Sequence, residues 1–125
     1  MAIYGIGAYH DNIDISNDFV SNNMACVGWD LSTAPDLHNL LSNIKEGDIV
    51  FIKSSPIGGG LRIKAIGIVK NATSRTHKLG TCIEVNWKWT GNKNLGKITG
   101  KYNVRNNTLF EEFHPSVINQ ILKLI

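Results

Sequence analysis

The stretch Gly47–Val69, GDIVFIKSSPIGGGLRIKAIGIV, contains two apolar, strand-like runs joined by a loop with three consecutive glycines. Apolar, β-branched runs bounded by Gly, Pro and Ser are typical of a β-hairpin. Three bases interrupt the apolar runs: Lys53, Arg62 and Lys64. Two interpretations follow. Either the bases lie on the solvated edges of an ordinary hairpin, or they belong to a site that binds an anion next to a planar ring.

Further strands are expected on both sides of this hairpin. A short apolar and aromatic run predicts a first strand at Ala2–Tyr9, and MACVGW predicts a second strand that starts at Met24. The remaining extended segments are expected to pair as an antiparallel meander, because they are separated by turns rich in Gly, Asn and Ser. They are Asp48–Ser54, Leu61–Lys70, Thr81–Trp89 and Lys97–Val104.

Three helical segments are predicted. One or two turns are expected at residues 16–22, with Ser16 as the N-cap. Pro35 and Pro115 each suit the first position of a helix and precede apolar residues at helical spacing. These apolar residues are Leu37, Leu40, Leu41 and Ile44 in one segment, and Val117, Ile118, Ile121, Leu122 and Ile125 in the other. The sequence predicts one α+β domain over residues 1–125, with a small twisted barrel of about six strands and two or three flanking helices.

Composition limits the class of protein. The chain has 125 residues, 42% of them hydrophobic, and a net charge of +3. No segment approaches the roughly 20 apolar residues that cross a bilayer, and the N-terminus lacks the pattern of a secretory signal. We therefore expect a cytoplasmic protein that does not enter a membrane. Cys26 and Cys82 each lie in an apolar run, and we expect buried, reduced thiols.

The order of these elements resembles a known superfamily. A strand at the N-terminus, GW at Gly28–Trp29, a helix, IKEGDIVFIKS at Ile44–Ser54 and LRIKAIGIV at Leu61–Val69 are similar to the EVE/YTH-like branch of the PUA-like superfamily. The similarity covers nearly the whole chain. It is greatest to the N-terminal modified-base-binding domains of modification-dependent (type IV) restriction motor proteins. The resemblance implies a non-enzymatic domain that binds a modified or flipped nucleobase in an aromatic pocket.

The aromatic residues suit such a pocket, because an extruded base needs a π-face and a few polar groups. Trp29 follows Gly28 where a strand gives way to a loop, and Asp30 is placed to accept from an amine or ring N–H of the base. The alternative is that Trp29 plugs the barrel and Asp30 caps the following LST. The resemblance places Tyr9 and His10, at the end of the first strand, in the pocket.

Trp89 lies beside a turn and is a further pocket candidate; Trp87 shares its strand face by alternation and is expected mainly in the core. Lys53, Ser54, Arg62 and Lys64 are expected at one end of the hairpin, where they would hold phosphates. The glycine-rich loop between the two strands would close over a ligand or serve as a plain hairpin loop; it lacks the GK[ST] of a phosphate-binding loop.

Catalytic patterns are missing from the sequence. No Ser/His/Asp or Cys/His set, HExxH or CxxC pattern can be named, so no enzyme activity, cofactor or metal is predicted. The leading hypothesis is a binding module for a modified or flipped base in DNA or RNA, with aromatic stacking and basic phosphate contacts.

Two alternatives remain. One is a stand-alone sensor or sequestering protein for a small free or cyclic nucleotide in phage–bacteria defence, with a separately encoded effector as a possible partner. The other is a protein-interaction module that uses the last helix. A continuous basic strip would favour nucleic acid, and a locally basic pocket would favour a nucleotide. The strip would comprise Arg75, Lys78, Lys88, Lys93, Lys97, Lys101 and Arg105.

Overall fold

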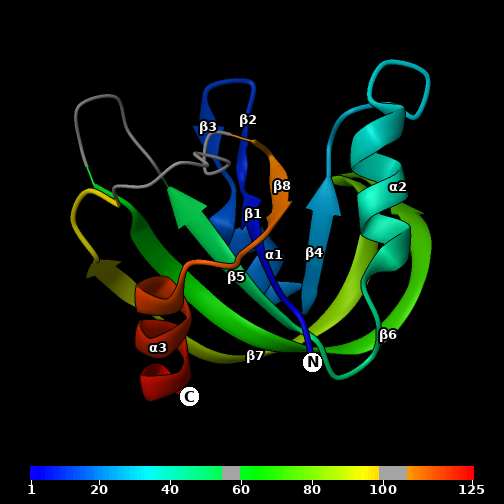
Figure 1. Ribbon diagram of the computed structural model, residues 1–125. Helices are drawn as coiled ribbons and strands as arrows, with labels where there is room; N and C mark the ends of the chain where they lie inside the picture. Colours follow the sequence, from blue (N-terminus) through cyan, green and yellow to red (C-terminus); the bar gives the residue numbers. More distant parts are fainter. Residues whose placement is uncertain (55–59, 99–106) are drawn as a thin grey trace.

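The computed structural model describes residues 1–54, 60–98 and 107–125. In these ranges the chain forms a small α+β domain with a curled six-stranded sheet, a separate two-stranded ribbon and three helices (Figure 1). The elements in chain order are β1 (Ile3–Gly7), β2 (Tyr9–His10), β3 (Ile13–Asp14), α1 (Ser16–Ser21), β4 (Met24–Val27), α2 (Pro35–Asn43), β5 (Ile49–Ser54), β6 (Arg62–His77), β7 (Gly80–Asn94), β8 (Leu109–Glu111) and α3 (Pro115–Leu124).

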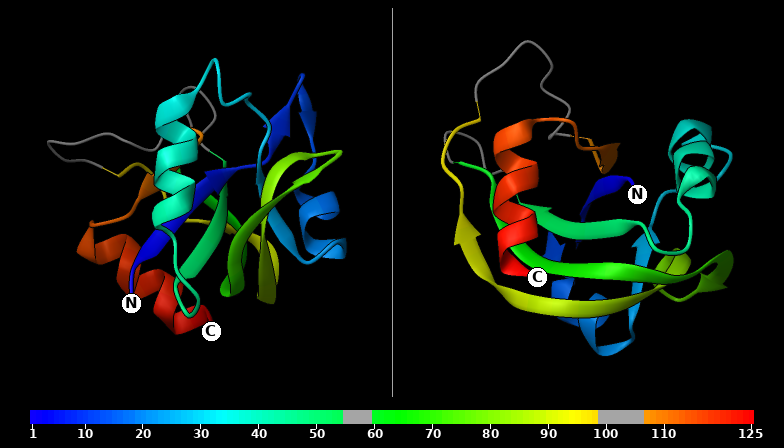
Figure 2. Two further views of the ribbon diagram at one scale, coloured as in Figure 1. Left: turned by 90° about the vertical axis from the view of Figure 1, so that its right-hand side faces the viewer. Right: turned by 60° about the horizontal axis from the view of Figure 1, so that its bottom comes forward.

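The six-stranded sheet has the order β4-β7-β6-β5-β1-β8. Its two longest strands, β6 and β7, form a bent hairpin that runs from the α3 side of the molecule to the α2 side (Figure 2). Helix α2 contacts both β4 and β8, which are the two outer strands of this order. The helix thus covers the opening of the curled sheet, which is one way in which a protein shields exposed strand edges.

Alternation along β5 divides the core into two clusters. Val50 and Ile52 pack with residues of α1 and α2, while Ile49 and Phe51 pack with residues of α3. Successive strand residues point to opposite faces of a sheet, and in β5 both faces are buried. The sheet therefore forms a middle layer, with α1 and α2 against one face and α3 against the other.

The two proline-started helices are confirmed. Pro35 and Pro115 occupy the first turns of α2 and α3. The N–H groups of a first turn have no partner within the helix, so proline loses no hydrogen bond there. The expected N-cap at Ser16 is wrong. Ser16 is the first residue of α1, and the Asp14 carboxylate instead accepts hydrogen bonds from the Ser16 amide and hydroxyl.

The main sheet has six strands, as expected, but the β2–β3 ribbon was not predicted and the pairing differs. β1 lies parallel to β5, so the sheet is not a simple antiparallel meander, and β6 and β7 extend well beyond the predicted ends. The structure shows no strand at residues 97–98, and the rest of the segment predicted at Lys97–Val104 lies outside the described residues. The next strand, β8, was not predicted; its three residues are too short to give a periodic signal.

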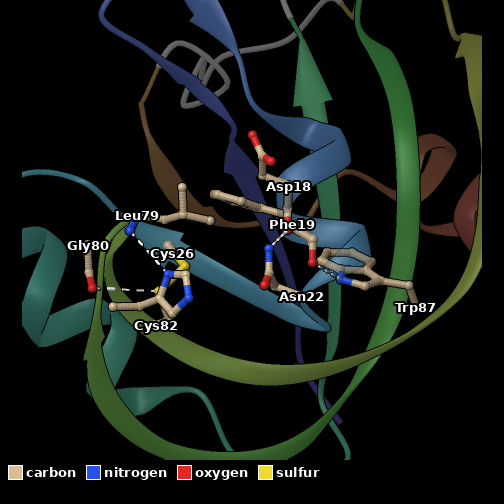
Figure 3. Close-up of a disulfide and its surroundings, with 9 residues drawn as sticks. Asp18, Phe19, Asn22, Cys26, Leu79, Gly80, Cys82 and Trp87 are labelled. Carbon is tan, nitrogen blue, oxygen red and sulfur yellow. Dashed lines mark hydrogen bonds between the residues drawn. A yellow bond between two sulfur atoms is a disulfide. The ribbon is translucent and has the colours of Figure 1, made fainter.

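The prediction of reduced thiols is wrong. Cys26 and Cys82 form a disulfide, with their Cα atoms 4.0 Å apart (Figure 3). The cause is strand register: β4 and β7 pair so that these residues, 56 apart in sequence, lie directly opposite one another. Sequence spacing alone carries no information about that register.

None of the described helices combines the length and the apolar character that crossing a bilayer requires.

Candidate functional site

One large hollow lies where three parts of the fold meet. The β2–β3 ribbon, the loop after β4 and the tip of the β6–β7 hairpin line a space of about 1010 Å³, which we call the Trp29 hollow. Its volume lies at the upper end of the roughly 300–1,000 Å³ of small-molecule sites. Its lining includes Tyr9, His10, Asp11, Ile13, Gly28, Trp29, Asp30, Leu31, His38, His77, Lys78, Gly80 and Thr81.

Two aromatic side chains of the Trp29 hollow are unusually exposed. Tyr9 is 66% exposed and Trp29 is 57% exposed, and the apolar side chains of Ile13 and Leu31 in the same lining are also exposed. Gathered apolar surface of this kind is a feature of binding sites, because burying it on a partner is favourable. The exposure also shows that Trp29 does not plug the barrel.

Helix α2 fixes the backbone beside Trp29. The His38 Nε2 donates to the Trp29 carbonyl oxygen at 2.6 Å, and the Asp30 carbonyl accepts from the amides of Thr33 and Ala34 at 3.1 and 2.8 Å. The turn before α2 is therefore held by the Asp30 backbone. The Trp29 ring and the Asp30 side chain remain available at the hollow on an anchored segment.

His10 packs tightly at the inner side of the hollow. Its ring meets the Phe19 ring edge-on at 6.2 Å between centroids, and a Cβ added to Gly28 would lie 2.6 Å from the His10 Cε1. Residue 28 must therefore be glycine for His10 to occupy this position. In the part of the chain that the structure describes, no group hydrogen-bonds the buried His10 Nε2.

Burial lowers the pKa of His10 more than the neighbouring Asp11 raises it. The folded protein thus binds the proton less tightly than the unfolded chain does, whose histidine has a pKa of about 6.5. We expect the free energy of unfolding to be fully retained above that pH and to fall as the pH drops toward the lowered pKa. Urea unfolding between pH 7.5 and 5.5 should show a shallower pH dependence for His10→Gln than for the wild type. Parallel curves would contradict this.

The predicted basic contacts lie elsewhere. Arg62 and Ser54 pair across the β5–β6 hairpin, at the end of β6 opposite to the one that lines the Trp29 hollow. The Lys53 Nζ lies 6.0 Å from the Phe110 ring centroid on the α3 side of the sheet, and burial lowers the pKa of Lys53. Most of the glycine-rich loop, residues 55–59, lies outside the described residues.

Lys64 belongs to a second, smaller hollow. It forms an ion pair with Asp14 there, beside Ser16, Thr90 and Asn92, around a space of about 640 Å³. Burial alone would raise the pKa of Asp14, but hydrogen bonds from Lys64 and Ser16 outweigh it and lower the pKa to about 2. The carboxylate therefore stays charged, and the Lys64 ammonium is already paired.

The Asp14–Lys64 pair is expected to stabilise the fold only weakly. Because the Asp14 side chain is 44% exposed, solvent screening limits its contribution to less than about 1 kcal/mol. That contribution is present above the unfolded pKa of 3.8 and is lost as the pH falls toward about 2. Chemical unfolding should show that Asp14→Asn is slightly less stable than the wild type at pH 7, and that the difference vanishes as the pH falls through about 2. A difference that persists at the lower pH would contradict this.

Alternation predicted that the two tryptophans of β7 share a face, but in the structure they lie on opposite faces. Trp87 packs with the α1 and α2 cluster and donates from its Nε1 to the Phe19 carbonyl at 3.1 Å, whereas Trp89 packs with the α3 cluster. A register shift opposite these residues, between Ile66 and Gly67 of β6, breaks the period of two. Trp89 is thus core packing and does not line the Trp29 hollow.

The structure therefore brings four of the predicted residues, Tyr9, His10, Trp29 and Asp30, to one hollow. It adds two histidines that were not predicted for the site, and Lys78, which was expected only in the basic strip. His38 belongs to α2, and His77 and Lys78 lie at the tip of the β6–β7 hairpin. Residues 71–80 separated two predicted strands, but only the fold shows that the tip of the β6–β7 hairpin meets the loop after β4.

Within the described residues, no three His, Cys, Asp or Glu side chains come close enough together to hold a metal ion. The chain matches no protein-family model and no curated protein.

Proposed function

We propose that this protein is a non-enzymatic, PUA-like domain of the EVE/YTH-like kind, and that the Trp29 hollow binds a modified or flipped nucleobase in DNA or RNA. The observation that carries the proposal is the pair of exposed aromatic rings, Tyr9 and Trp29, on different elements of one hollow. An extruded base requires an aromatic face for stacking and polar groups at its edge. Asp30 and Tyr9 supply acceptors and a donor beside those rings.

A second candidate is a sensor or sequestering protein for a free nucleotide. It is favoured by charge: among the described residues that line the Trp29 hollow, Lys78 is the one lysine or arginine. Arg75 and Lys70, on the same strand β6, lie 3.8 and 3.9 Å from carboxylate oxygens of Glu84. One lysine suits a single phosphate better than a long backbone, and the lining also carries the carboxylates of Asp11 and Asp30. Two residues of the expected basic strip, Lys101 and Arg105, lie outside the described residues.

Equilibrium binding with labelled oligonucleotides separates the two candidates. The probes are unmodified strands and strands with methylated or hydroxymethylated bases, each at two salt concentrations, with mononucleotides and cyclic nucleotides as competitors. A base reader should prefer one modified strand, and its affinity should fall with salt in proportion to its phosphate contacts. If no oligonucleotide binds and a free nucleotide raises the melting temperature, the base-reader proposal fails and the nucleotide candidate takes its place.

The matched variants are Trp29→Ala and Phe113→Ala. Both remove an exposed aromatic ring, but Phe113 lies outside the Trp29 hollow. Binding that survives in the Phe113 variant and is lost in the Trp29 variant would assign the ligand to the hollow.

We further propose that the protein acts in a cytoplasm, as part of a defence against modified foreign nucleic acid. There the Cys26–Cys82 disulfide would meet thiol reductants.

A further inference from the structure

The disulfide lies beside the Trp29 hollow on both of the strands that it joins. Val27 and Gly28, which follow Cys26, line the hollow, and so do Gly80 and Thr81, which precede Cys82. Both cysteines are completely buried. The covalent bond thus connects two backbone segments whose adjoining residues line the hollow. Figure 3 shows the disulfide between Cys26 and Cys82.

The strand that carries Cys26 is buried in the core, but its backbone pairing is short. β4 is an outer strand of the sheet and pairs with β7 over only four residue pairs, from Met24–Glu84 to Val27–Thr81. The close approach continues at Gly80, where a Cβ would lie 2.2 Å from the Val27 carbonyl oxygen and φ is +123°. A short outer strand opens more readily than a central one, because few hydrogen bonds hold it.

We infer that the Cys26–Cys82 disulfide is a redox-controlled latch on the Trp29 hollow. With the disulfide formed, β4 is fixed to β7 and the segment Val27–Leu31 presents Trp29 and Asp30 in the binding geometry. With the disulfide reduced, β4 separates from β7 more often and the hollow binds its ligand more weakly. The ligand part of this inference rests on the proposed function; the structural part does not.

The chemistry needs a dithiol reductant, either a small molecule or a protein with a pair of thiols. One thiolate of the reductant attacks a sulfur of the disulfide, the Cys26–Cys82 bond breaks, and a mixed disulfide forms. The second thiol of the reductant then displaces that cysteine. The reductant thereby transfers two electrons and two protons to Cys26 and Cys82, which become two thiols, and the reductant becomes a disulfide. Because both cysteines are buried, the attack must wait until β4 opens, so ligand in the hollow should slow reduction.

Hydrogen exchange of the backbone amides, read by mass spectrometry, tests the latch without any ligand. The samples are the protein purified without reductant, the same protein reduced with dithiothreitol, and the double variant Cys26→Ala, Cys82→Ala. Reduction should speed exchange at Met24–Leu31 by about tenfold or more and leave the central strands β1 and β5 unchanged. The double variant should match the reduced protein and should not respond to dithiothreitol, which controls for effects of the reagent.

Three results would overturn the latch. They are equal exchange at Met24–Leu31 in the oxidised and reduced protein, an equal rise in β1 and β5, and an intact mass without reductant that corresponds to two free thiols. The oligonucleotide titration is then repeated on both redox forms, with an expected loss of about tenfold in affinity on reduction. If no oligonucleotide binds either form, the base-reader proposal fails, while the exchange result still decides whether the latch exists.

Discussion

Replacing Phe19 with alanine is expected to lower the free energy of unfolding by about 3–5 kcal/mol. Phe19 is completely buried and is the largest α1 side chain in the cluster between the sheet and helices α1 and α2. Its removal takes apolar surface out of the core and leaves a cavity that the neighbouring side chains fill only in part. For a domain of this size the loss is a large fraction of the total stability of about 5–15 kcal/mol.

Urea unfolding of the wild type, Phe19→Ala and Phe113→Ala measures this effect. The same ring is removed in both variants, but Phe113 is 72% exposed, and its loss should change the stability by no more than about 0.5 kcal/mol. Similar losses for the two variants would mean that α1 does not pack as described. Because the His10 ring packs edge-on against Phe19, the Phe19 variant should also disturb the inner wall of the Trp29 hollow.

Replacing Trp29 with alanine is expected to weaken ligand binding by about 1–3 kcal/mol, or roughly 5- to 150-fold in Kd. Base stacking on an aromatic side chain supplies energy of this size, and Trp29 is the largest exposed ring in the hollow. The fold should be affected little, since more than half of the side chain is already in contact with water. The measurements are the oligonucleotide Kd and the melting temperature of each variant.

A conservative variant makes this prediction sharper. Trp29→Phe keeps a smaller π-face and should retain part of the affinity, whereas Phe113→Ala should retain all of it. If Trp29→Ala binds as tightly as the wild type while its melting temperature is unchanged, Trp29 is not the stacking platform. If all variants lose affinity in proportion to their loss of stability, the effect is on folding and not on the site.

The helices and strands were the most predictable part of this protein. Pro35 and Pro115 gave the starts of α2 and α3, because proline is favoured only in the first turn. The parallel pairing of β1 with β5 could not be predicted, since local periodicity does not distinguish parallel from antiparallel partners. The disulfide could not be predicted either, because its formation depends on the register of β4 against β7.

The candidate site was predictable in part. Tyr9 with His10 and Trp29 with Asp30 each lie where a short strand ends, and the structure brings both pairs to one hollow. Arg62 lies far from it because β6 has 16 residues, which at about 3.3 Å each amount to roughly 50 Å of chain. The sequence predicted a strand that ends at Lys70 and gave no sign of the additional length that carries the hairpin tip to the hollow.

The most direct test of base binding in the Trp29 hollow is a nuclear magnetic resonance titration that follows the indole N–H signals. The chain has three tryptophans, and Trp87 and Trp89 are partly buried and pack against the two core clusters. Addition of the preferred oligonucleotide should shift the Trp29 indole and the amides of Gly28–Leu31 to saturation, and leave the other two indoles nearly unchanged. Shifts centred on α3 or the Trp89 side of the sheet, with Trp29 unmoved, would contradict the proposed site.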